Sequence, residues 1–248
     1  MGYIINPFLV VPSDPMPPLD MQVWYRSDFE VELGGVPAVN GGLLDWWGDK
    51  SANGHEAIQP TMAQQPTYNE GVINGLPAIN FPAATNQLMD IANGSSDLVP
   101  PTNTAFSLFA VLRPTDFASP MVLSQRNSAA GQVQWYIATS GKQIWSNGSE
   151  SLPSDTSLTA AAWNRIGFIV PNHSTGNVTY YLNGAADGVQ ALGVSGGSGS
   201  SELVFMGNPP GFVFPFKGDV AEYLFYTREV TGSEVTQIDN YFTSRYAL

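Results

Sequence analysis

The segment WWGDKSANGH at residues 46–55 gathers side chains of the kinds that bind ligands. A tryptophan indole offers a broad apolar face with one polar N–H group, and a sugar ring can stack on that face where it is exposed. Because neighbouring residues of a strand point to opposite sides, we expect only one of the two tryptophans to be free for a ligand. The candidate ligand-binding residues of this segment are Trp46, Trp47, Asp49, Asn53 and His55.

The same segment contains DKSANG (49–54), which matches the first half of an EF-hand calcium loop. The twelfth position of that loop should be a bidentate Glu and is Pro60, so an EF-hand is excluded. Asp49 and Asn53 stay candidates for a calcium site of another kind, and the alternative is a tight turn held by their side chains. With 2 histidines and no cysteine, zinc sites of three histidines or of thiolates are excluded, and no other cofactor is expected.

Patterns for catalysis are sparse in this chain. Glu30 and Glu32 would share one side of a strand, and two carboxylates are the minimum for a retaining glycosidase, although such an isolated pair is usually solvated. GVSGG (193–197) fits the G-x-S-x-G nucleophile pattern, but the residues after it predict a loop rather than the required helix, and its histidine partner would have to be His55 or His173. We therefore expect no enzymatic activity, and a glycoside hydrolase or lyase is the last alternative.

The charge of the chain limits its partners. Lys and Arg number 9 against 21 Asp and Glu, which gives a net charge of −12. Such a chain is repelled by phosphate backbones and by anionic membrane surfaces, so neither nucleic acid nor membrane is an expected partner. No apolar run reaches the roughly 18 residues that a membrane-spanning helix needs.

The elements that must position these residues are mostly strands, because runs of aromatic and β-branched residues alternate with Gly, Asn, Pro and Ser. Such regular short strands predict an all-β sandwich of two antiparallel sheets. Thr231 and Glu234 have the spacing of a capping box, and Val235, Ile238, Phe242 and Tyr246 mark one face of a helix at 231–246. The predicted strands are 21–26, 106–114, 121–125, 132–139, 142–148, 164–171, 177–184, 202–208 and 218–228.

The first twenty residues differ from the rest. Apolar residues are followed by four prolines, a composition that favours extended backbone over helix. We predict an extended N-terminal arm at 1–20, ahead of a single domain at 21–248. The arm would dock its apolar side chains on a neighbouring subunit, and its candidate contact residues are Tyr3, Ile4, Ile5, Pro7, Phe8 and Leu9.

Several segments together resemble a known family. WWGDKSANGHEAIQ (46–59), NEGVINGLPAINF (69–81), FSLFAVLRP (106–114), VTYYLNG (178–184) and the segment 216–246 are similar to successive motifs of laminin-G-like, concanavalin A-like jelly rolls. The resemblance implies two face-to-face sheets and a short C-terminal helix. Members of this family bind glycans, mediate adhesion or act as structural modules, and the E-x-D-x-x-E strand of its glycosidases is missing here.

The opening YIINPF also resembles the start of tailed-phage virion proteins that carry such jelly rolls. The resemblance implies a virion structural protein on the particle surface, such as a capsid decoration (cement) or tail-associated subunit. It would contact other virion proteins, such as a major capsid protein, and form symmetric homo-oligomers such as trimers. The alternative is a lectin-like module, extracellular or at a cell surface, that binds a host-surface glycan.

Overall fold

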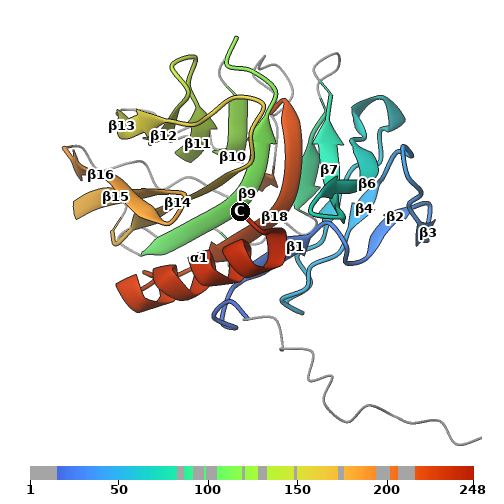
Figure 1. Cartoon of the computed structure of the whole chain (residues 1–248), viewed down its shortest axis with the longest axis horizontal. Helices are drawn as coiled ribbons and strands as arrows, with labels where there is room; N and C mark the ends of the chain where they lie inside the picture. The colour runs from blue at the N-terminus through green and yellow to red at the C-terminus, as the bar shows by residue number, and fades with distance from the viewer. Residues whose placement is uncertain are drawn as a thin grey trace, which may run out of the picture.

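The computed structural model describes residues 16–82, 87–91, 98, 105–118, 121–127, 133–147, 150–172, 176–193, 202–205 and 216–248. Over these residues the chain forms two antiparallel sheets that pack face to face, with one C-terminal α-helix on the outside (Figure 1). The predicted all-β jelly-roll sandwich is therefore confirmed. No helix among these residues is long and apolar enough to cross a membrane.

One sheet has eight strands within the described residues, and its central strands are long and buried because both of its faces are covered. Strands β9 (Phe106–Pro114) and β18 (Gly218–Tyr226) have almost continuous apolar sequences, as expected for such a position. In spatial order the strands are β16 (Ala185–Leu192), β15 (Gly176–Leu182), β14 (Asn164–Val170), β9 (Phe106–Pro114), β18 (Gly218–Tyr226), β7 (Leu76–Phe81) and β6 (Thr67–Ile73), and β1 (Val23–Arg26) also pairs with β18.

The other sheet has ten strands in the described part of the chain, and several of them are only two or three residues long. These short strands were not predicted, because a run of two or three residues is too short to show an alternation of apolar and polar side chains. The order is β13 (Ser151–Ser157), β12 (Lys142–Ser146), β11 (Val133–Ile137), β10 (Met121–Asn127), β17 (Glu202–Phe205), β8 (Met89–Ile91), β5 (Ala57–Ile58), β4 (Trp46–Trp47), β2 (Val31–Leu33) and β3 (Val36–Pro37), and a 3₁₀ turn, η1 (Met62–Gln64), follows β5.

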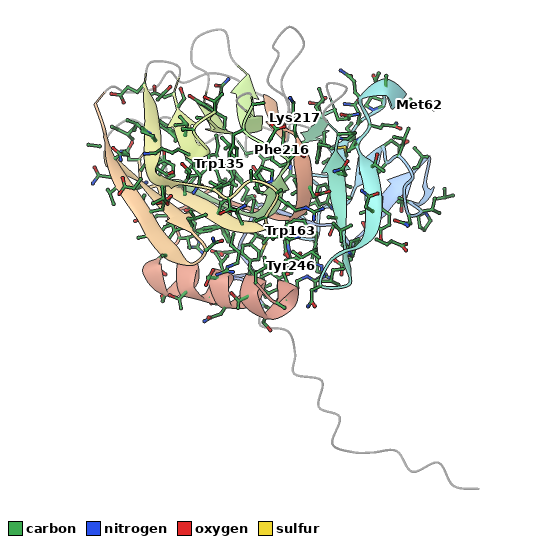
Figure 2. All side chains as sticks on the ribbon, turned by 45° about the horizontal axis from the view of Figure 1, so that its top comes forward. Met62, Trp135, Trp163, Phe216, Lys217 and Tyr246 are labelled. Atoms are coloured by element: carbon green, nitrogen blue, oxygen red, sulfur yellow. The ribbon has the colours of Figure 1, made fainter. Side chains whose placement is uncertain are left out.

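The main core fills the space between the two sheets. Trp135 and Trp145 of the ten-stranded sheet and Tyr180 and Tyr223 of the eight-stranded sheet are all at most 1% exposed. The indole of Trp135 lies 5.0 Å from the ring of Phe168 in the opposite sheet, measured between ring centroids, and Figure 2 shows Trp135 inside the sandwich. Burial of these large aromatic side chains is the main stabilising contribution to the fold.

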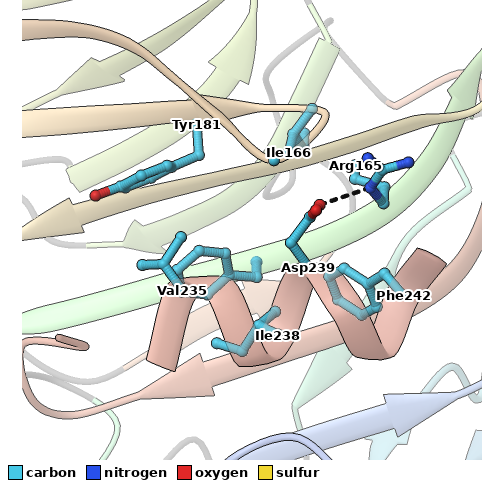
Figure 3. A pocket seen from close by; sticks show the side chains of 9 residues that line it. Arg165, Ile166, Tyr181, Val235, Ile238, Asp239 and Phe242 are labelled. Atoms are coloured by element: carbon cyan, nitrogen blue, oxygen red, sulfur yellow. Dashed lines mark hydrogen bonds and ion pairs between the residues drawn. The ribbon is translucent and has the colours of Figure 1, made fainter. Parts of the chain in front are cut away.

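A second core lies between the eight-stranded sheet and helix α1 (Gly232–Tyr246). The helix begins at the Thr231 N-cap, where the predicted capping box with Glu234 is present. It buries Val235, Ile238, Tyr241, Phe242 and Tyr246 against the sheet, which confirms the predicted helical face. Figure 3 shows this contact, including the ion pair of 2.7 Å between Arg165 of β14 and Asp239 of the helix.

A buried carboxylate, Glu222, fastens the helix to the sheet. A register shift between Val220 and Glu222 turns this side chain toward the helix side of β18. Its carboxylate is fully buried and accepts hydrogen bonds from the Trp24 indole (2.5 Å), the Tyr241 hydroxyl (2.7 Å) and the Tyr246 hydroxyl (2.7 Å). Burial raises the pKa of Glu222 above its ordinary value, and the three donors oppose that rise.

Residues 16–20, which were predicted to belong to the arm, contact the domain. The Gln237 side chain donates to the Met16 carbonyl, and the Tyr226 hydroxyl donates to the Pro18 carbonyl. Asp20 forms an ion pair of 2.6 Å with Arg228. The predicted arm residues Tyr3, Ile4, Ile5, Pro7, Phe8 and Leu9 lie outside the described residues.

Candidate functional site

The outer face of the ten-stranded sheet carries a cross-strand row centred on Trp46. Trp46 lies opposite Glu32 of β2 on one side and opposite Ile58 of β5 on the other. Side chains alternate across a sheet, so Trp47 and Ala57 of the same strands point into the core and are fully buried. Trp46, Glu32 and Ile58 are partly exposed, and an indole thus lies between a carboxylate and an aliphatic side chain on the surface.

A hollow of about 270 Å³ lies over this row. Asp45 adds a second carboxylate to it, whose position is fixed because both oxygens accept hydrogen bonds of 3.0 Å from the backbone N–H of Gly34. The complete lining is Glu32, Gly35, Asp45, Trp46, Ile58 and Pro60. Apolar surface beside fixed hydrogen-bond acceptors is the arrangement that holds a polar ring with an apolar face, such as a sugar.

A second hollow, of about 300 Å³, shares Glu32 as a lining residue with the first. It brings together Glu30 and Glu32, the two acids that the sequence suggested as a glycosidase pair, with Asp28 and the half-buried Tyr68. Glu30 has a φ of 46°, a left-handed conformation that is uncommon for a residue other than glycine. The full lining is Ser27, Asp28, Glu30, Val31, Glu32, Pro37, Ala38 and Tyr68.

The structure separates the two adjacent tryptophans as the alternation predicted. Trp47 is fully buried, and its indole N–H donates a hydrogen bond of 2.9 Å to the carbonyl of Arg26. It packs against Tyr25 in the main core, with 5.4 Å between ring centroids. Inclusion of Trp47 among the ligand-binding candidates is therefore corrected, since it is core, and Trp46 is the member of the pair that a ligand can reach.

The polar candidates that follow form a turn rather than part of the hollow. Asp49 is buried, and its carboxylate accepts from the backbone N–H groups of Trp24 (2.9 Å), Ser51 (2.9 Å) and His55 (3.2 Å). The Asn53 amide donates 3.0 Å to the carbonyl of Met21. This is the turn held by Asx side chains that was the alternative to a calcium site.

Neither His55 nor the rest of this turn joins the Trp46 hollow. His55 is 4% exposed, so as a ligand contact it is corrected. Among the described residues, no three His, Cys, Asp or Glu side chains converge as a metal-binding cluster. Calcium binding by Asp49 and Asn53 stays a prediction. Of the nucleophile motif at 193–197, only Gly193 lies within the described residues, and His173 lies outside them.

Sequence reasoning missed Asp45, Ile58 and Pro60 as site residues. These residues meet only because β2, β4 and β5 pair with one another. That pairing joins segments that are apart in the sequence, and no local pattern reveals it. Trp163 is partly exposed on the helix side of the molecule, with the Arg113 guanidinium 5.1 Å from its ring centroid. It provides a second partly exposed tryptophan, away from the hollow.

Comparison with solved structures finds other proteins with a similar fold. Domain 4 of AbnA, a GH43 extracellular arabinanase from Geobacillus stearothermophilus in complex with arabinotriose, is similar over 89% of this chain and 98% of its own, with 14% identity and a TM-score of 0.62. The Ruminococcus gnavus IT-sialidase CBM40 bound to α2,3-sialyllactose is similar over 65% of this chain and 96% of its own, with 12% identity and a TM-score of 0.51.

The botulinum neurotoxin serotype G binding domain is similar over 88% of this chain and 50% of its own, with 14% identity and a TM-score of 0.58. At such identities these likenesses concern the fold. No curated protein sequence matches the chain. The family model Laminin_G_3, described as the concanavalin A-like lectin/glucanases superfamily, matches residues 85–236, which is more than half of the chain. The chain therefore belongs to the concanavalin A-like lectin/glucanase superfamily.

Proposed function

We propose that this protein is a glycan-binding module without catalytic activity, and that it holds carbohydrate on the outer face of its ten-stranded sheet. The observation that carries the proposal is the hollow of about 270 Å³ beside the partly exposed Trp46. The features around the hollow are simple in chemical terms: an aromatic platform, two aliphatic neighbours and two carboxylates, Glu32 and Asp45.

Each part of the hollow has a counterpart on a sugar ring. The apolar C–H face of a pyranose or furanose ring stacks on the indole, as apolar groups do on aromatic faces. Side chains directly opposite on neighbouring strands have Cβ atoms about 5 Å apart, so the Glu32 carboxylate lies beside the edge of a ring stacked on Trp46. Carboxylate oxygens accept the hydrogen bonds that sugar hydroxyl groups donate at this edge.

The comparisons support this proposal at the level of function class. Two of the similar structures hold a sugar, arabinotriose in one and α2,3-sialyllactose in the other. They differ in ligand, and their identities to this chain are 14% and 12%, so the sugar has to be inferred from the residues of this chain.

A glycan array with labelled wild-type protein tests the proposal. We expect binding to at least one class of oligosaccharide. We also expect at least a tenfold loss of affinity in Trp46→Ala, by analogy with nucleic-acid bases, whose stacking on an aromatic side chain contributes on the order of 1–3 kcal/mol. Trp163→Ala is the matched control, because it removes a partly exposed tryptophan away from the hollow. Absence of binding across the array, or equal binding by Trp46→Ala, would overturn the proposal.

Binding without turnover is part of the proposal. The two acids of the second hollow, Glu30 and Glu32, are the pair to test for hydrolysis. We expect oligosaccharides bound by the protein to be recovered intact after long incubation. Product formation that disappears in Glu30→Gln or Glu32→Gln would make the protein a glycosidase instead.

A structural role on a virion surface remains a second proposal, and the anchored residues 16–20 favour it because they give the preceding segment a fixed origin beside β18 and α1. Co-sedimentation with stripped phage particles tests this role. The full chain is expected to bind and a chain that lacks residues 1–15 is expected not to bind. Equal binding by both would reject the arm as an assembly device.

A further inference from the structure

We infer that the Trp46 hollow selects a hexosamine glycan whose amino groups are free and protonated, rather than an N-acetylated or an acidic sugar. This inference rests on the proposed function and names the ligand class of the same site. It follows from the charge of the residues that line the two hollows and from the position of one carboxylate, that of Glu32, opposite Trp46.

The ionisable side chains that line the two hollows are all carboxylic acids apart from one tyrosine. Glu32 and Asp45 line the first hollow, and Asp28, Glu30 and Glu32 line the second, with Tyr68. No Lys or Arg side chain is among the lining residues of either hollow. A carboxylate- or sulfate-bearing sugar in the Trp46 hollow would therefore meet the like charges of Glu32 and Asp45, and like charges placed together oppose binding.

These carboxylates differ in how far they are neutralised. Asp28 forms ion pairs with Arg26 (2.6 Å) and with Arg245 (2.5 Å), so its charge is compensated. Glu30 and Glu32 form no hydrogen bond or ion pair with another residue of the described part of the chain through their carboxylates. Of these two, Glu32 is the uncompensated carboxylate directly opposite the indole of Trp46, and a cation can neutralise it.

Glu32 is the residue that couples charge to the aromatic platform. It lines both hollows and lies directly opposite Trp46 in the register of β2 and β4. An ammonium group on a sugar ring that stacks on Trp46 would contact the Glu32 carboxylate and the face of the indole at the same time. Trp is the aromatic side chain that attracts a cation most strongly, so both contacts favour the protonated amine.

The same carboxylates do not make a metal site. They are divided between two hollows, and no three His, Cys, Asp or Glu side chains of the described residues form a group that could hold a metal ion. An ammonium group on an extended polymer needs no such convergence, because each amine pairs with one carboxylate. The hollows of about 270 and 300 Å³ share Glu32 as a lining residue.

The test is calorimetric titration of the full chain with two matched ligands, a β-1,4-linked glucosamine tetramer with free amines and its N-acetylated form. We expect the free-amine tetramer to bind about threefold to tenfold more tightly at low salt, the range that one or two exposed ion pairs contribute. The preference should shrink with added salt and when the amine is deprotonated at higher pH. Sialyllactose, which carries a carboxylate, is expected to bind more weakly than either.

Two variants of equal charge change locate the effect. Glu32→Gln should abolish the preference for the free-amine tetramer, because both tetramers then meet the same neutral amide. Glu229→Gln, a change at an exposed acid on the helix side of the molecule, should leave the preference intact. Equal affinity for both tetramers, with binding still lost in Trp46→Ala, would overturn this inference and leave the proposed function standing. Tighter binding of sialyllactose would overturn it as well. Absence of binding to every ligand would overturn the proposed function itself.

Discussion

Replacement of Glu222 by Ala should destabilise the fold strongly, because the three donors around this carboxylate have no other acceptor of equal quality. The Trp24 indole (2.5 Å) and the Tyr241 hydroxyl (2.7 Å) lose their partner, while Tyr246 keeps only a long contact of 3.4 Å to the Ala221 carbonyl. A buried donor left without an acceptor costs about 1–3 kcal/mol. For these donors together we expect a loss of about 3–5 kcal/mol in the free energy of unfolding.

Glu222→Gln separates the role of shape from that of charge. The amide oxygen still accepts from Trp24 and Tyr241, so most of the hydrogen bonding is kept, and we expect a loss of only about 1 kcal/mol. Urea unfolding followed by tryptophan fluorescence measures both variants. Glu229→Ala, at an exposed acid near the start of α1, is the control and should change stability by less than about 0.5 kcal/mol.

The pH dependence provides the refuting result. Burial raises the pKa of Glu222 in the folded state, so between its ordinary and its raised pKa the folded protein binds a proton that the unfolded chain releases. The contribution of this residue to the free energy of unfolding therefore decreases as pH rises through that window, and Glu222→Gln should remove this decrease. A loss below about 1 kcal/mol in Glu222→Ala, or a wild-type minus Gln difference that grows with pH, would refute the reasoning.

Three further changes test other contacts. Gly184→Ala should lower the free energy of unfolding, measured in urea, by about 2 kcal/mol, because the φ of Gly184 is +85° and a Cβ would overlap the Asp239 carboxylate. In an Asp239→Ala background this loss should fall to about 1 kcal/mol, and an unchanged loss would contradict the proposed overlap. Hydrogen bonding from Arg228 lowers the pKa of Glu234 from 4.5 to about 2. The stabilisation that the Glu234 carboxylate gives the fold is therefore present above pH 4.5 and is lost as pH falls toward 2. The melting temperature of Glu234→Gln should vary less over this pH range than that of wild type, and parallel curves would be inconsistent with the ion pair. Asp49→Ala should lower stability by about 2 kcal/mol because three backbone donors lose their acceptor, and the calcium prediction requires that calcium raise the melting temperature of wild type but not of this variant.

The parts of the fold that could be predicted depend on short-range patterns. The helix and its capping box at Thr231 and Glu234 involve residues three positions apart, and the strand at 106–114 is a continuous apolar run with the bounds that β9 has. The resemblance to laminin-G-like domains correctly gave two sheets and a C-terminal helix.

The candidate site could be predicted only in part, because its geometry depends on strand register. Alternation showed that one of Trp46 and Trp47 faces outward, but which one depends on how β4 pairs with β2 and β5. The role of Glu222 was hidden for a related reason. Its indole partner, Trp24, lies 198 residues away in sequence, and a local register shift in β18 sets the direction of the carboxylate.

The most direct test of the Trp46 platform is an NMR titration that follows the indole N–H signals of all 6 tryptophans as a glycan is added. Trp47, Trp135 and Trp145 are at most 1% exposed and serve as internal references. Trp46, by contrast, lies on the proposed binding face. The account predicts a saturating shift of the Trp46 signal with the buried signals unchanged. A saturating shift at Trp163 with Trp46 unmoved, or no shift with any glycan, would contradict it.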